Sequence, residues 1–179
     1  MANTHNIFEP LRMASQDVVS YDRSIVSTTD LDNGYIVVET VPATNVYGSN
    51  ELDTYTATAP ADVTTENILV VDSGDVARID GSFRIDVADP RYNYVPANVT
   101  ARARQLHVGD EFNASAGCFA VAPTVGQFVG AANGSNQWAA SVAAVSSITA
   151  KCACKVIGTK TFSIGRQNVT GYRLKVVKA

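Results

Sequence analysis

Valine and threonine dominate this chain, and they constrain its fold more than any other feature. The 179 residues include 24 valines and 16 threonines but only 6 leucines. Side chains branched at Cβ have one strongly preferred rotamer in a helix, whereas they pack well on a pleated surface. Short runs of such residues alternate with turn signals such as Asn33-Gly34. We therefore predict an all-β protein, an antiparallel β-sandwich or barrel with at most one short helix.

Segment 135–148 is the one place where the pattern favours a helix. Trp138, Val142 and Val145 follow one another at helical spacing. Ser135 or Asn136 precedes them and has the side chain of an N-cap. We predict that the single short helix lies here.

The first 16 residues have no regular apolar period and contain Pro10. We expect them to form an N-terminal arm that becomes ordered on a partner or a neighbouring subunit, with disorder as the alternative. Ile7, Phe8 and Leu11 would be the contact residues of this arm. Residues 17–179 are predicted to form a single β-rich domain. Deleting residues 1–16 should then weaken assembly and leave that domain folded.

Several features bear on compartment and partners. No run approaches the ~20 apolar residues of a membrane span, and the N-terminus lacks the apolar core of a signal peptide. The three cysteines are an odd number, which argues against a disulfide framework. The net charge of −3 gives no general attraction to nucleic acid. We expect folding in a cytoplasm, with no membrane and no nucleic acid as partner.

Residues 107–121, which read HVGDEFNASAGCFAV, concentrate the side chains with catalytic potential. Gly109-Asp110 is a turn signal between apolar positions, and the adjacent residues Asp110 and Glu111 should point to opposite faces. We therefore interpret the stretch as strand-turn-strand. Alanine at His107, Asp110 or Glu111 should leave function intact and cost only modest stability. An enzyme that uses His107 with one of the two carboxylates stays open as an alternative.

The spacing of Cys152 and Cys154 is that of half a metal site. Alternation, however, places both with Val156 on one face of a strand, which favours buried thiols. The chain also has only two histidines, His5 and His107. We predict no catalytic residue, no metal and no cofactor.

The charges of the chain are unevenly distributed. All 17 acidic side chains fall in residues 1–111 beside 7 basic ones, which gives −10, while residues 112–179 carry 7 basic side chains and no acidic one. Two interpretations stay open. Either the C-terminal strands neutralise acidic strands of the same chain, or they form an outward basic face that docks on an acidic partner. The residues of this predicted face are Lys151, Lys155, Lys160, Arg166, Arg173 and Lys175.

Four segments, in their order and character, carry a family resemblance. They read YDRSIVSTTDLDNGYIVVET, ARARQLHVGDEFNAS, TVGQFVGAANGS and TGYRLKVV, within residues 18–177. In this succession the chain resembles the small β-rich capsid decoration (head-stabilising, cement) proteins of tailed bacteriophages. The resemblance implies a structural protein of the virion, made in the host cytoplasm and located on the capsid surface, with no cofactor. The implied partners are the shell of major capsid protein and further copies of the chain, as a homo-oligomer for which a trimer is favoured.

A second hypothesis is a phage tail or baseplate component, or a carbohydrate-binding β module. Exposed aromatic side chains that stack on sugar rings would favour the carbohydrate-binding module. The sequence contains seven tyrosines and a single tryptophan, Trp138, for such a role.

Overall fold

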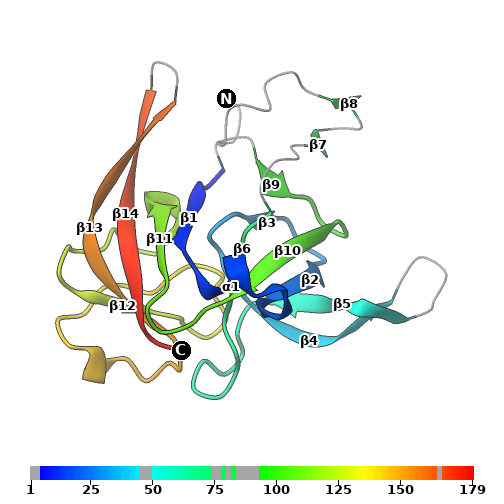
Figure 1. Cartoon of the computed structure of the whole chain (residues 1–179), viewed down its shortest axis with the longest axis horizontal. Coiled ribbons are helices and arrows are strands. Elements are labelled where there is room, and N and C mark those ends of the chain that lie inside the picture. The colour runs from blue at the N-terminus through cyan, green and yellow to red at the C-terminus, as the bar shows by residue number, and fades with distance from the viewer. Residues whose placement is uncertain (1–4, 45–49, 74–77, 80–81, 84–92, 165–166) are drawn as a thin grey trace.

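The computed structural model describes residues 5–44, 50–73, 78–79, 82–83, 93–164 and 167–179. About half of these residues lie in strands and few lie in helices, so the predicted all-β fold is confirmed. Two β bodies lie side by side, a five-stranded sheet and a closed five-stranded barrel (Figure 1). All strand pairs are antiparallel except β2 with β5.

The sheet has the strand order β1-β11-β14-β13-β12. Its strands are β1 (Phe8–Arg12), β11 (Glu111–Ser115), β14 (Gln167–Lys178), β13 (Ala153–Ile164) and β12 (Phe128–Gly130). In β14, Tyr172, Leu174 and Val176 are buried while Arg173 and Lys175 are exposed. This is the predicted alternation of a half-buried antiparallel strand. The sheet therefore has an inner face that packs in the core and an outer face that carries charge.

The barrel closes in the order β10-β2-β5-β4-β6. Its strands are β2 (Asp22–Val26), β4 (Ile36–Thr44), β5 (Asn50–Thr58), β6 (Leu69–Val71) and β10 (Thr100–Gln105). In β4, Val37 packs in one apolar cluster with other barrel residues, whereas its neighbours Ile36 and Val38 pack in a second cluster. The apolar runs at 36–38 in β4 and 69–71 in β6 follow from burial of both faces there.

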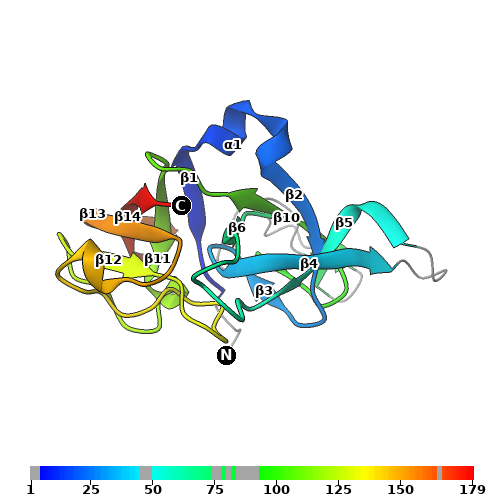
Figure 2. The ribbon, with the colours of Figure 1, turned by 90° about the horizontal axis from the view of Figure 1, so that it is seen from below.

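The second cluster joins the two bodies. It combines Ile36 and Val70 from the barrel with Phe112, Leu174 and Trp138 from the sheet body. All five side chains have no exposed surface. Figure 2 shows β6 and the beginning of β4 at the side of the barrel nearest the sheet, from which β4 then runs away. The inner face of the sheet is thus covered by the barrel wall.

The remaining elements are short. Strand β3 (Leu31–Asp32) pairs with β9 (Tyr94–Val95), and β7 (Arg78–Ile79) pairs with β8 (Ser82–Phe83). Within the described ranges the one α-helix is α1, which covers Ala14–Asp17. Short 3-10 turns occur at Val19–Tyr21, Ala116–Cys118 and Val145–Ser147.

The helix predicted within 135–148 is wrong. The backbone N–H of Trp138 donates to the carbonyl of Cys118 at 2.9 Å, and the N–H of Val142 donates to the carbonyl of Phe128 at 2.8 Å. These bonds to distant segments replace the i to i−4 bonds of a helix. Trp138 is fully buried while Val145 is 39% exposed, so the helical spacing does not mark one buried face. Tertiary pairing overrides the local pattern here.

The N-terminal segment is also not an arm on a neighbour. Residues 8–12 form β1, an edge strand that pairs with β11 of the same chain. Ile7 and Met13, on either side of this strand, are 4% and 3% exposed. The lack of a regular apolar period in this segment has a physical reason, because an edge strand accommodates Pro10. The expected boundary at residue 16 therefore does not coincide with the edge of the fold.

Candidate functional site

The stretch 107–111 folds as a turn. The N–H of Asp110 donates to the carbonyl of His107 at 3.0 Å, and Gly109 has a φ of +102°. The Asp110 carboxylate is 4% exposed and accepts the backbone N–H groups of His107 and Ala14, both at 2.9 Å. The predicted turn is confirmed, and Asp110 links it to the start of α1.

The two adjacent carboxylates point in different directions, as alternation predicts. Glu111 lies on the outer face of the sheet, where its oxygens are 2.9 Å from Arg173 and 3.8 Å from Lys175. The His107 ring packs against Tyr21 with centroids 4.0 Å apart, and its Nδ1 has no hydrogen-bond partner among the described residues. The structure does not bring His107, Asp110 and Glu111 together around one point.

Replacing Asp110 with alanine should lower the free energy of unfolding by about 2–4 kcal/mol, because two part-buried N–H groups lose their buried acceptor. This is a larger loss than the modest one expected from the sequence, since burial and the bond to Ala14 were not foreseeable. Urea unfolding of the variant measures it. Glu111→Ala is the matched control and should change stability by less than about 1 kcal/mol, because its ion pairs are at the surface. Equal losses in both variants would contradict the role given to Asp110.

The three thiols are buried. Cys118 has no exposed surface, and burial raises the pKa of its thiol to about 12, although a hydrogen bond with Ser115 acts in the opposite direction. Cys152 and Cys154 are 2% and 0% exposed and belong to the same core cluster as Val156. Burial, with a further contribution from Cys152, raises the pKa of Cys154 well above its usual value. The predicted buried thiols are confirmed.

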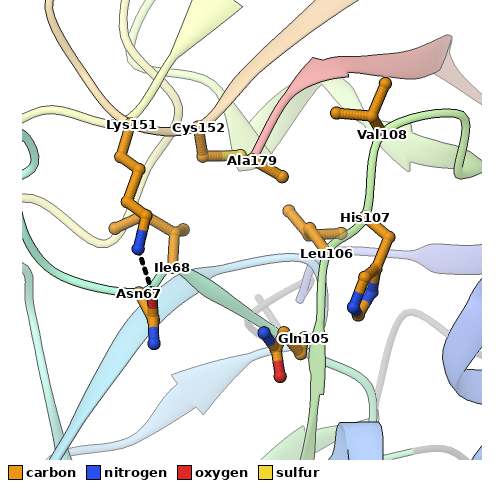
Figure 3. Close-up of a pocket in the computed structure, with 9 residues that line it drawn as sticks. All are labelled: Asn67, Ile68, Gln105, Leu106, His107, Val108, Lys151, Cys152 and Ala179. Carbon is orange, nitrogen blue, oxygen red and sulfur yellow. Dashed lines mark hydrogen bonds between the residues drawn. The ribbon is translucent and has the colours of Figure 1, made fainter.

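A pocket of about 290 Å³ opens where the two bodies meet (Figure 3). Lys151 lines it and donates to Oδ1 of Asn67. The pocket is lined by Asn67, Ile68, Gln105, Leu106, His107, Val108, Lys151, Cys152 and Ala179. In Figure 3 the His107 ring points away from the centre of the pocket. Lys151 therefore belongs to this pocket between the sheet and the barrel, and not to the outer sheet face to which the sequence assigned it.

The outer face of the sheet carries the remaining basic residues in two rows. In one row Glu111 lies opposite Lys175, which lies opposite Lys155, which lies opposite Phe128. The second row runs through Glu9, Asn113 and Arg173. Lys160 reaches this face further along β13 and is 3.4 Å from Glu9. We call the set Lys155, Lys160, Arg173 and Lys175, with Glu9 and Glu111, the basic face.

The structure thus places the described members of the predicted partner-binding set in three groups. Ile7, Phe8 and Leu11 belong to or adjoin the edge strand β1, and Phe8 packs on Phe112 with ring centroids 5.2 Å apart. Lys155, Lys160, Arg173 and Lys175 share the basic face. Lys151 lies at the pocket, and Arg166 lies outside the described residues.

Sequence reasoning missed a buried ion-pair network in the barrel. Arg104 is 6% exposed and contacts Asp72, which is 5% exposed, and also Asp22 at 3.1 Å. Arg102 reaches the same Asp72 at 3.1 Å. The signal was present in the run Ala101 to Arg104, because alternating Ala and Arg places both guanidinium groups on one side of a strand.

Searches of family models, curated proteins and solved structures found no match to this chain. Among the residues that the structure describes, no group of three or more His, Cys, Asp or Glu side chains is arranged to hold a metal ion. Within the same residues, no helix has the length and apolar character needed to cross a membrane.

Proposed function

We propose that the protein is a structural component of a phage virion, which binds the outside of an assembled capsid as an oligomer and stabilises it. The observation that carries this proposal is the outer face of the five-stranded sheet. It is built on two strands of 12 residues each, and its side chains Lys155, Arg173 and Lys175 are exposed. A long two-stranded face with exposed charged side chains suits a protein that acts by contact with another protein surface.

The positions of the chemically reactive side chains also support a structural role. The Asp110 carboxylate holds a turn, and the thiols of Cys118, Cys152 and Cys154 are buried. A carbohydrate-binding module has less support, because Trp138 is fully buried and therefore offers no stacking surface to a sugar ring.

Co-sedimentation with shells assembled from the major capsid protein of the same phage tests the proposal. We expect saturable binding and a higher disruption temperature of the decorated shell, because a ligand of the assembled state stabilises it. Sedimentation velocity of the free chain should show an oligomer, with a trimer expected. A chain that stays in the supernatant at every concentration, with shells unchanged in their disruption temperature, would contradict the proposal.

A further inference from the structure

Two lysines lie directly opposite each other on the basic face. Lys155 and Lys175 are register partners in β13 and β14, and both are exposed. Like charges at directly opposed positions destabilise a sheet. The chain therefore carries this pair at a cost to its own stability.

Acidic residues of the same chain compensate the basic face only in part. Glu111 forms ion pairs with both Arg173 and Lys175, and Glu9 forms an ion pair with Lys160. The Lys155 ammonium lies 5.8 Å from the centroid of the Phe128 ring, and none of the described carboxylates is within ion-pair distance of it. Four cations against two anions leave the face with a charge of +2.

In the barrel, by contrast, a buried cation is paired with carboxylates of the same chain. There Arg104 has two carboxylate partners, Asp72 and Asp22. Next to Lys155 on the sheet, the extra residue of a β-bulge, Ile157, is instead 39% exposed. A single exposed apolar side chain is ordinary on a protein surface, so the surplus charge is what distinguishes this face.

We propose that the basic face is the docking surface, and that an acidic patch of the shell protein places carboxylates between Lys155 and Lys175. This inference rests on the proposed function for the identity of the shell. Charge complementarity indicates a protein partner and not a nucleic acid. Glu9 and Glu111 interrupt the face, so a continuous phosphate backbone would meet them, whereas carboxylates on a protein surface can alternate with them.

The test removes the two opposed charges with Lys155→Gln/Lys175→Gln. Shell binding should weaken about tenfold at low salt and become less salt-dependent, because two ion pairs across the interface are lost. The melting temperature should stay equal to or above that of the wild type, because the repulsion within the sheet is relieved. Weaker shell binding together with an unchanged or higher melting temperature indicates a docking role. A structural role would instead lower the melting temperature.

The matched control is Lys151→Gln/Lys178→Gln, which makes the same change in net charge away from the basic face. Lys151 bonds to Asn67 and Lys178 bonds to the carbonyl of Ile148. Shell binding by this control should equal that of the wild type. Equal weakening in both variants, or no weakening in Lys155→Gln/Lys175→Gln, would overturn the inference while leaving the proposed function intact.

Immobilised poly-glutamate and duplex DNA complete the experiment. The wild type should bind poly-glutamate at low salt through the basic face, and Lys155→Gln/Lys175→Gln should not. If the wild type fails to bind shells, that result contradicts the proposed function. The poly-glutamate measurement then tests the inference by itself. Absence of face-dependent poly-glutamate binding, or stronger face-dependent binding to DNA than to poly-glutamate, overturns the acidic protein partner.

Discussion

Replacing Arg104 with methionine should lower the free energy of unfolding by about 3–5 kcal/mol, because the substitution leaves Asp72 as a buried carboxylate without its main partner. Arg104 and Asp72 are 6% and 5% exposed, so water does not compensate the loss. The guanidinium group also donates to the Ser15 carbonyl at 3.2 Å and to Asp22 at 3.1 Å. It thereby connects β10 to α1 and β2. Urea unfolding monitored by circular dichroism measures the effect.

Arg102 provides the matched control. It contacts the same Asp72 at 3.1 Å, but its side chain is 45% exposed. Arg102→Met should therefore cost no more than about 1 kcal/mol. The double variant Asp72→Leu/Arg104→Met should recover part of the loss, since a buried ion pair replaced by apolar side chains is often tolerated. A stability of Arg104→Met equal to that of Arg102→Met would show that the buried network does not stabilise the fold.

The fold class was predictable because strand periodicity is a local property. The alternation of Tyr172, Leu174 and Val176 with Arg173 and Lys175 assigns inner and outer faces with no knowledge of the partner strands. The high content of valine and threonine has the same effect over the whole chain. What this periodicity leaves open is which strands pair, because residues such as Phe8 and Ala114 lie far apart in the sequence.

The errors arose where distant residues determine local structure. Trp138 lies at helical spacing with Val142, but its indole is buried in the core and its Nε1 donates to the carbonyl of Gly34 at 3.3 Å. Lys151 was assigned to the outer face by extending the alternation of β13 backwards. The register shifts between Ala153 and Cys154, and the strand begins only at Ala153, so that extension fails.

The sequence predicts which charged side chains of the candidate site point outward. It does not predict which carboxylates pair with them. Lys155, Arg173 and Lys175 are exposed, as the alternation predicts. The interpretation in which charges neutralise across strands holds for Arg173 through Glu111 and for Lys160 through Glu9. Neither contact is visible in the sequence, because β11 with Glu111 and β1 with Glu9 lie far along the chain from β13 and β14. Whether the remaining charge faces a partner stays a prediction.

Deleting residues 1–13 should destabilise the protein severely, in contrast to the outcome expected for an arm. Ile7 and Met13 are 4% and 3% exposed, and burial of two such side chains contributes about 3–6 kcal/mol. Ile7 also exchanges hydrogen bonds with Ser115, donating its N–H to Oγ at 2.9 Å and accepting the Ser115 N–H at 2.8 Å. Much of the stability typical of a small protein would be lost with this strand.

The deletion should also change solubility, because it uncovers the edge of β11. An uncovered edge strand presents unpaired N–H and C=O groups to other chains and promotes aggregation. Thermal unfolding and light scattering should therefore show a lower midpoint together with association at higher protein concentration. Deleting only residues 1–4 is the control, since it keeps Ile7, β1 and Met13 in the chain, and it should leave both readouts unchanged. A soluble 14–179 fragment with an unaltered midpoint would restore the arm hypothesis, because β1 would then be dispensable to the sheet on which the basic face is built.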